Sequence, residues 1–267
     1  MSLSRAVVAE LADALFEAEK SGRQIAIPSV SHPAITLDDA YAVQKALVER
    51  KVAAGATPIG WKIGLTSRAM QAALAIDTPD SGVLLDDMTF QSGSMVPPGR
   101  FIEPRVEAEI AFVMKDDLEP DATRDDVIEA TGHVAAALEI LDTRVVRRDP
   151  ATGAMRKVFD TVADNAANAG IVMSDVRHPV GAFDLRRVGA IVKRDGIVEE
   201  TGLGAGVLDD PASGLAWLVR RLAEQGDRIR AGDVVLSGSF IRPIECPPGA
   251  GIHADFAQFG TVAIRFA

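Results

Sequence analysis

The sequence has very little cysteine and no long apolar run. Cys246 is the only cysteine among 267 residues, which excludes an intrachain disulfide and a CxxC metal or redox motif. No run of about 18 apolar residues is present, and the N-terminus lacks the apolar segment of a signal peptide. We therefore expect a cytoplasmic protein with no membrane partner.

Positive charge is also scarce. The chain has 28 Lys and Arg against 38 Asp and Glu, a formal net charge of −10, and a nucleic-acid binder would normally show a basic domain or patch. We therefore expect no nucleic-acid partner. The four histidines are scattered without metal-ligand spacing, at positions 32, 133, 178 and 253.

The first third of the chain has the signals of helices. Residues 4–20 have apolar side chains at helical spacing and stop at Gly22, and residues 36–55 open with a capping-box pattern, Thr36 with Asp39. A short buried strand is expected at 60–66, followed by a short helix at 67–75.

Strand patterns dominate from Gly93 onward. Two capped helices are predicted among them, at 123–130 and from Pro211 to about 226. The expected strands are 105–115, 133–143, a hairpin over 186–200, 232–240 and 260–266. We predict an α+β fold forming one unit over 1–267, with a helical N-terminal part (1–92) and a strand-rich, metal-binding core (93–267).

The stretch RVEAEIAF, residues 105–112, has two different faces. Val106, Ala108 and Ile110 alternate as an apolar face, so Glu107 and Glu109 point to the other side, roughly 6.5–7 Å apart. One explanation is a solvated polar face, which is common on half-buried strands.

Glu139 favours a second explanation. It lies in AAALEIL, flanked by six apolar residues, where an uncompensated carboxylate is costly. Three convergent carboxylates, Glu107, Glu109 and Glu139, favour a hard ion such as Mg²⁺ or Mn²⁺. Lys62, in its apolar strand, is a candidate to balance the excess negative charge; the alternative is a surface lysine with a buried stem.

Two other motifs are weaker. TGLGAG (201–206) imitates a dinucleotide-binding loop but follows a hairpin rather than opening a βαβ helix, so a loop is expected. LSGSF lacks the GxSxG elbow, so Ser237 and Ser239 are not expected to be acyl-enzyme nucleophiles.

Six segments spread over the chain occur together in a fixed order. They are KIGLTSRAMQ, TPDSGVLLDDM, FIEPRVEAEIAFV, ALEILDTR, RKVFDTVADNAANAG and LSGSFIRP. Together they resemble the fumarylacetoacetate hydrolase superfamily, and within it the hydratases of aromatic-degradation pathways that act on 2-hydroxypentadienoate and 2-oxohept-4-ene-1,7-dioate, with 4-oxalocrotonate decarboxylases as near relatives. One departure is Ser81, where the seven-carbon hydratases usually have an aromatic residue.

The resemblance implies a β-roll core and the same three metal ligands, Glu107, Glu109 and Glu139. It also implies that Lys62 and Asp80 line the pocket, Lys62 as the electrostatic partner and Asp80 as acid or base. Mg²⁺ (or Mn²⁺) is the expected cofactor, and no organic cofactor is expected. Relatives form homodimers that assemble further, so a homo-oligomer is expected, with a pathway decarboxylase as a possible partner.

The function implied is hydration of a 2-hydroxydienoate or 2-oxo-enoate, with 2-oxohept-4-ene-1,7-dioate as the expected substrate. The alternatives are a 4-oxalocrotonate-type decarboxylase, an acylpyruvate hydrolase, or a non-catalytic partner subunit. A second carboxylate on the substrate would need a cation, because guanidinium binds carboxylate in a bidentate fork. Arg242 is the leading candidate, with Arg144 as runner-up and Ser239 as a further substrate contact.

Overall fold

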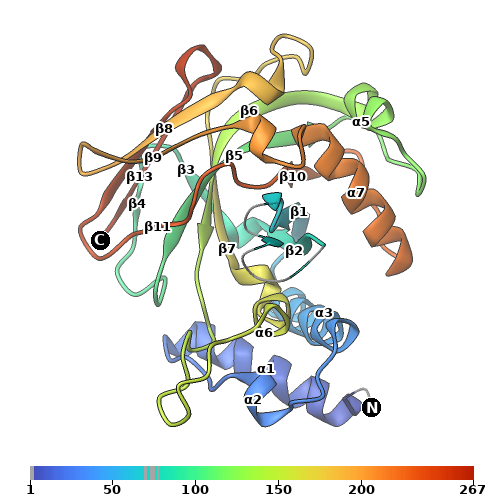
Figure 1. Ribbon diagram of the computed structural model, residues 1–267, viewed down its shortest axis with the longest axis vertical. Coiled ribbons are helices and arrows are strands. Elements are labelled where there is room, and N and C mark those ends of the chain that lie inside the picture. The colour runs from blue at the N-terminus through green and yellow to red at the C-terminus, as the bar shows by residue number, and fades with distance from the viewer. Residues whose placement is uncertain (1–2, 69–70, 73–75, 77) are drawn as a thin grey trace.

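The N-terminal helices form a layer under a strand-rich body (Figure 1). The structure is a computed structural model, and it describes residues 3–68, 71–72, 76 and 78–267. The layer has its own apolar core, to which Leu15, Leu47 and Val162 contribute. It consists of α1 (Arg5–Ser21), α2 (Pro28–Ser31), α3 (Leu37–Ala53) and α6 (Val158–Ala163).

Both N-terminal helices have the predicted ends. The Ser4 side chain accepts a hydrogen bond from the N–H of Val7 at the start of α1, and Gly22 ends that helix with φ 66°. At α3, Thr36 and Asp39 form the reciprocal capping box. These caps satisfy backbone groups that a helix terminus would otherwise leave without a partner.

The larger sheet contains the longest strands. Within the described ranges its order is β2-β1-β10-β5-β6-β7-β3, and β11 pairs with the part of β5 that β10 does not cover. The bounds are β1 (Pro58–Gly64), β2 (Asp80–Leu85), β3 (Thr89–Gln91), β5 (Arg105–Met114), β6 (Thr131–Leu141), β7 (Asn168–Met173), β10 (Val234–Leu236) and β11 (Ile244–Glu245).

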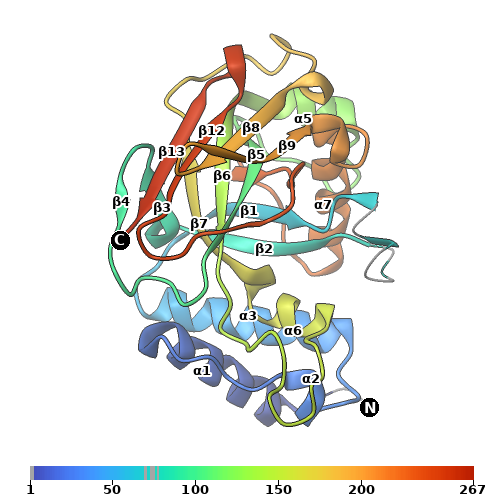
Figure 2. The same ribbon diagram turned by 60° about the vertical axis from the view of Figure 1, so that its left-hand side comes forward.

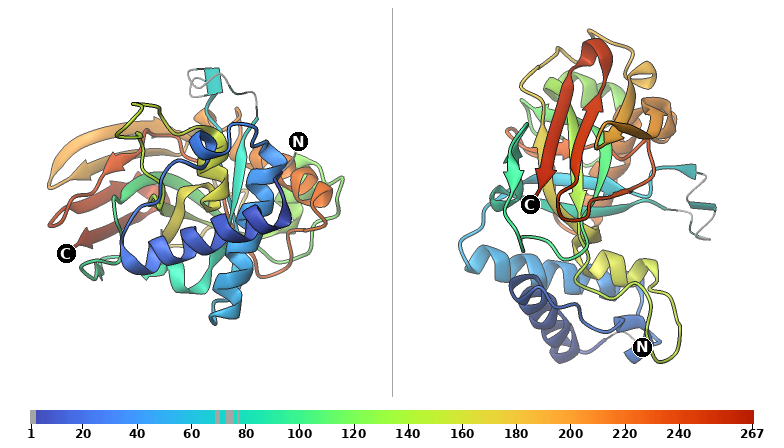
Figure 3. Two further views of the ribbon diagram at one scale, coloured as in Figure 1. Left: turned by 90° about the horizontal axis from the view of Figure 1, so that it is seen from below. Right: turned by 90° about the vertical axis from the view of Figure 1, so that its left-hand side faces the viewer.

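A second sheet packs across the first, as Figures 2 and 3 show. Its order is β4-β13-β12-β8-β9. The main core contains Ile110 and Phe112 of β5, Ile264 of β13 and Leu218 of α7. The bounds are β4 (Met95–Val96), β8 (Gly189–Arg194), β9 (Ile197–Leu203), β12 (Gly251–Asp255) and β13 (Thr261–Phe266), with the helices α5 (Arg124–Ala130) and α7 (Pro211–Glu224).

Turn and cap predictions in the second half are confirmed as well. The β8–β9 hairpin turns at Asp195 and Gly196, both with positive φ, which explains the Asp-Gly pair. Asp210 caps α7 by accepting from the N–H of Ala212, and Thr123 with Asp126 forms the capping box of α5. Short 3-10 turns complete the chain: η1 (Asp86–Met88), η2 (Asn165–Ala167), η3 (Leu185–Arg187), η4 (Gly204–Gly206) and η5 (Ala257–Phe259).

The boundary between helices and strands differs from a division at residue 92. β1, β2 and β3 precede that residue yet pair with strands of the core, Lys62 of β1 lying opposite Leu236 of β10. Conversely, α6 comes from the middle of the chain and joins the helical layer. The helical layer and the strand-rich body therefore each contain segments from both sides of residue 92. The predicted helix at 67–75 lies partly outside the described residues.

The strand predicted at 232–240 is shorter than expected. β10 ends at Leu236, and Gly238 has φ 111°, outside the strand region. The chain nevertheless stays beside β5, because Ser237 N–H donates to Ile110 O and Phe240 N–H donates to Ala108 O. No helix formed by the described residues is long and apolar enough to cross a membrane.

Candidate metal centre and catalytic cavity

The pairing of β5 with β6 brings the three predicted carboxylates together. Glu107 lies directly opposite Glu139, and Glu109 is two residues further along β5 on the same face. One carboxylate oxygen of each residue lies within 4.8 Å of the others. Ala108 and Ile110, on the opposite face of β5, pack into the main core. The strand thus buries one face and gathers charge on the other.

Most of this charge has no hydrogen-bond partner. Glu109 and Glu139 are fully buried, and among the described residues nothing donates to Glu109 Oε1 or to either oxygen of Glu139. One donor is present, the N–H of Gly238, which lies 2.8 Å from Glu109 Oε2. Buried carboxylate oxygens without donors are ligands for a hard divalent cation, so the residues present fit Mg²⁺ or Mn²⁺.

The electrostatics of the cluster also favour a cation. Burial, reinforced by the negative charge of Glu139, raises the pKa of Glu107 to about 8, and the positive charge of Lys62 only partly offsets this. Burial likewise raises the pKa of Glu109 and that of Glu139. Without a metal the cluster therefore retains protons near neutral pH, and a divalent ion would replace them.

Lys62 and Asp80 lie beside the cluster. Lys62 Nζ is 3.4 Å from Glu139 Oε1 and 4.0 Å from Asp80 Oδ1; both are ion-pair distances without hydrogen-bond geometry. Burial lowers the pKa of Lys62, but the negative charges of Glu139 and Asp80 outweigh it, so the pKa is raised overall. Burial raises the pKa of the Asp80 carboxyl, against the opposing effect of Lys62.

Two glycines make these close approaches possible. Gly64 pairs with Asp80 across β1 and β2, and a Cβ at Gly64 would lie 2.1 Å from Asp80 Oδ1 and 2.9 Å from Lys62 Nζ. A Cβ at Gly238 would lie 2.4 Å from Thr66 Oγ1. Any larger residue at these two positions would have to displace the site's side chains.

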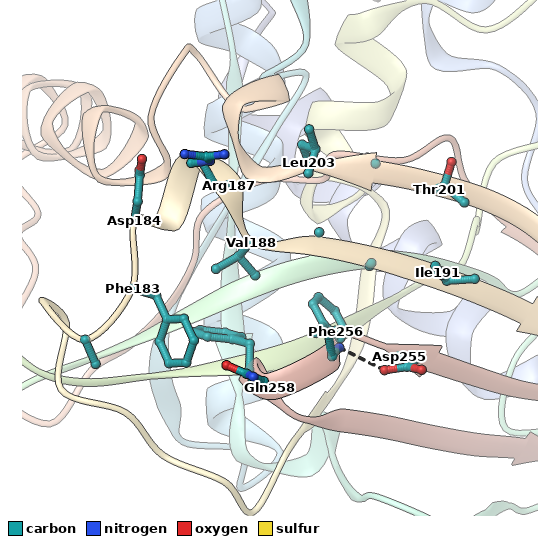
Figure 4. Close-up of a pocket in the computed structure, with 16 residues that line it drawn as sticks. Phe183, Asp184, Arg187, Val188, Ile191, Thr201, Leu203, Asp255, Phe256 and Gln258 are labelled. Atoms are coloured by element: carbon teal, nitrogen blue, oxygen red, sulfur yellow. Dashed lines mark hydrogen bonds between the residues drawn. The ribbon is translucent and has the colours of Figure 1, made fainter.

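A small cavity of about 150 Å³ lies at this cluster. Larger hollows of about 1010 Å³ and 840 Å³ lie elsewhere, so size alone would select the wrong place. The 840 Å³ hollow is lined largely by apolar side chains such as Phe183, Val188 and Phe256 (Figure 4). The smaller cavity is the candidate site, because the titratable side chains Lys62, Asp80 and Glu107 all line it.

One wall of the cavity is a left-handed turn. Asn165, Ala166 and Ala167 in η2 have φ of 51°, 52° and 59°, and the two alanines line the cavity. The Asn165 side chain holds the turn, accepting from Val83 N–H at 2.8 Å and donating to Val83 O at 2.9 Å. Strained non-glycine backbone of this kind persists only where its surroundings fix it, and it clusters at functional sites.

The predicted substrate contacts occupy different surroundings. Ser239 and Arg242 line the cavity, but the Ser239 hydroxyl bonds within its own turn, to Ile241. Arg242 pairs with Glu200 at 2.6 Å, and its side chain is 77% exposed. Arg144 is buried and is not among the cavity-lining residues; its Nε lies 2.5 Å from Asp164 Oδ1.

Sequence analysis missed two groups that the structure places at the site. The backbone N–H of Gly238 could not be inferred from side-chain types, although the quoted LSGSFIRP segment contains it. Arg156 lines the cavity and is the first residue of the segment RKVFDTVADNAANAG. It is far from Lys62 and Glu107 in the sequence, so no motif spacing indicates that the three side chains meet.

Comparison with known proteins agrees with this geometry, although no protein-family model matched the chain. The chain is 47% identical over 257 residues to the 2-oxo-hept-4-ene-1,7-dioate hydratase of Escherichia coli, covering 96% of each chain. A solved 4-oxalocrotonate decarboxylase from Pseudomonas putida G7, complexed with magnesium and adipate, superposes with a TM-score of 0.92 at 33% identity over 99% of each chain.

A more distant structure fixes the fold. A putative fumarylacetoacetate hydrolase family protein from Yersinia pestis CO92 matches with a TM-score of 0.56 at 17% identity, over 79% of this chain and 94% of its own. The predicted strand-rich fold with N-terminal helices, that of the fumarylacetoacetate hydrolase superfamily, is thereby confirmed. The chain belongs to the family of these hydratases and 4-oxalocrotonate decarboxylases, and it shares the fold of the fumarylacetoacetate hydrolase family.

Proposed function

We propose that the protein is a divalent-metal-dependent hydratase that adds water to a 2-hydroxydienoate or 2-oxo-enoate, with 2-oxohept-4-ene-1,7-dioate as substrate. The observation that carries the proposal is the buried cluster of Glu107, Glu109 and Glu139 beside Lys62 and Asp80. The 47% identity to a hydratase of that substrate supports the choice of reaction.

Glu107, Glu109 and Glu139 would hold the metal, Mg²⁺ or Mn²⁺. When bound, such an ion supplies Lewis-acid polarisation of a 2-oxo acid. The protein's own contribution is a dry, preformed set of carboxylates, since two of the three are fully buried. The Gly238 N–H fixes one oxygen of Glu109 and thereby orients that carboxylate.

Lys62 would act as an electrostatic partner rather than as a base. Its raised pKa keeps it protonated at neutral pH, so it has no free lone pair to accept a proton. Because it is buried, its charge acts through a medium of low polarity on negative charge that develops on the substrate's 2-oxygen.

Asp80 would move the protons. Shifting the C4=C5 double bond into conjugation removes a proton from C3 and delivers one to C5. Water then adds with its oxygen bonding to C4 and a proton returning to C3. Burial raises the pKa of the Asp80 carboxyl, so its protonated form is easier to reach than that of an exposed aspartate, which suits a group that both takes up and releases protons.

The test is a product assay on the purified protein with 2-hydroxydienoates of five and seven carbons. A hydratase gives a product heavier by one water in the presence of Mg²⁺, and excess chelator abolishes it. Release of CO₂ instead would establish the second candidate, a 4-oxalocrotonate-type decarboxylase, which the structural match to such an enzyme favours. Absence of both reactions would leave the acylpyruvate hydrolase and partner-subunit alternatives.

A homo-oligomer, and association with a pathway decarboxylase, remain proposals of the same kind. Ser239, Arg242 and Arg144 likewise remain proposed substrate contacts. Of these, Ser239 and Arg242 line the cavity and Arg144 does not.

A further inference from the structure

The cationic side chains that line the cavity are not equivalent. Within the described part of the chain they are Lys62, Arg156 and Arg242. Lys62 is surrounded by carboxylates, and Arg242 is paired with Glu200. Arg156 forms no ion pair with any described carboxylate; its Nη1 donates to the hydroxyl of Thr143 at 2.5 Å. One full positive charge in the cavity thus lacks a counter-ion.

Hydrogen bonds hold Arg156 in place beside the end of β6. Thr143 is buried and follows the end of β6, the strand that carries Glu139. The backbone N–H of Arg156 donates to Arg147 O at 3.1 Å, which fixes the loop from the other side. The guanidinium is therefore set at a defined position relative to the carboxylate cluster.

The surroundings of Arg156 favour an anionic ligand. Burial, together with repulsion from Arg147, lowers the pKa of Arg156 to about 10, against the opposing charge of Asp164. Asp164 does not neutralise it, because its carboxylate is already bound by Arg144. Arg156 stays protonated at neutral pH, and a ligand carboxylate would relieve an unfavourable, half-buried cation.

We propose that Arg156 binds the distal carboxylate of a 2-oxo diacid and makes the enzyme select diacids over monoacids. This inference rests on the proposed function for the identity of the substrate. The opposite end of the substrate, with its 2-oxo and 1-carboxylate oxygens, would then lie at the glutamate cluster. Arg156 is better suited than Arg242, whose side chain is mostly in water and already paired, where an ion pair contributes little.

The kinetic test uses Arg156→Met, which keeps the stem and removes the charge, and Arg156→Lys, which keeps the charge and removes the fork. For Arg156→Met we expect kcat/KM on the seven-carbon diacid to fall on the order of 100-fold, mostly through KM, with the five-carbon monoacid changed less than about threefold. Arg156→Lys should recover part of the loss. Arg148→Met, an exposed arginine of the same loop, is the matched control and should change neither substrate.

The binding test does not depend on turnover. Calorimetry on the Mg²⁺-loaded protein compares adipate with hexanoate, which differ only in the distal carboxylate. Wild-type protein should prefer adipate, and Arg156→Met should lose that preference while Arg148→Met keeps it. Equal loss on both ligands, no loss, or no preference in the wild type would overturn the role of Arg156. A wild type that binds adipate selectively but hydrates neither substrate would overturn the proposed function and leave the anchor standing.

Discussion

Two groups of buried charge lie close together along the chain, at the end of β6 and just beyond it. Glu139 belongs to the cluster with Glu107 and Glu109, whereas Arg144 pairs with Asp164. Glu109, Glu139, Arg144 and Asp164 are buried, and Glu107 is partly buried. They differ in how many of their polar atoms have hydrogen-bond partners. We interpret the group with few partners as a ligand-binding site and the group with many as a contact that stabilises the fold.

The Arg144–Asp164 pair is satisfied from several directions. Asp164 Oδ1 accepts from Arg144 Nε and Oδ2 accepts from its backbone N–H, while Arg144 Nη2 donates to the backbone oxygen of Asp164 at 2.6 Å. At Glu139 both carboxylate oxygens lack any hydrogen bond from the described residues. Glu139 has an ion-pair contact with Lys62 but no hydrogen bond, and its cluster contains more carboxylates than cations. Buried carboxylates in such an arrangement are costly, so we expect the cluster to be kept for the ligand that it binds.

Replacing Glu139 by Gln should produce the largest effect of the predictions drawn from this comparison. We expect Mg²⁺-dependent turnover to fall by about three orders of magnitude or more, because a metal ligand and its Lewis-acid chemistry are lost. The metal-free protein should be at least as stable as wild type, since the excess of buried carboxylates over the single cation Lys62 is reduced by one. Steady-state kinetics with thermal denaturation in chelator test both halves, and full activity in Glu139→Gln would remove the metal mechanism.

Replacing Arg144 by Met should give the opposite pattern. Asp164 is then left buried without its cation, and we expect a loss of about 3–5 kcal/mol in the free energy of unfolding. The double variant Arg144→Met/Asp164→Leu should recover much of it, because both charges are removed together. Denaturant unfolding measures this. An unchanged stability with a raised KM would instead support Arg144 as the substrate contact that the sequence suggested.

Replacing Lys62 by Met tests whether the cation of the cluster serves catalysis or the fold. We expect kcat to fall about 10²- to 10³-fold, because charge on the substrate oxygen loses its buried partner. Metal affinity should change little or increase, since a competing positive charge is gone. Single-turnover kinetics with metal titration separate the two effects, and a kcat within about twofold of wild type would assign Lys62 to structure.

How much of this site the sequence predicts depends on the range of the contact. The two faces of β5 and the burial of Glu139 follow from strand periodicity and local hydrophobicity, and the structure has both. The role of Asp80 is predicted only by the family resemblance, because its position opposite Gly64 depends on the pairing of β1 with β2. Pairing partners distant in sequence have no local signal.

The distal part of the cavity shows the same limit. The segment around Arg242 favours it as the distal contact, but no local pattern indicates that Glu200 of β9 pairs with it. Arg156 reaches the cavity from the loop before α6, and that loop is positioned by the packing of a helix from the middle of the chain on the N-terminal layer. Such placements depend on tertiary packing, which local patterns do not encode.

The smallest predicted effect is the contribution of Glu107 to the pH dependence of stability. The pKa of Glu107 is raised from an ordinary value of 4.5 to about 8, so between these pH values the folded metal-free protein binds more protons than the unfolded chain. Its stability should therefore decrease as pH rises from 5 to 8, on the order of 1–2 kcal/mol, because Glu107 is only partly buried and solvent screens its charge.

Thermal denaturation in chelator across this range measures the slope, and Glu107→Gln is the control that should lessen it, since Glu109 and Glu139, whose pKa values are also raised, remain. His133, whose pKa burial lowers, acts in the opposite direction, and the difference between wild type and Glu107→Gln removes that contribution. Added Mg²⁺ should stabilise the wild type more at pH 8 than at pH 6, since the ligands are then deprotonated. A melting temperature that rises with pH in chelator, equally in both proteins, would show that the cluster is satisfied without a metal and would remove its contrast with Arg144 and Asp164.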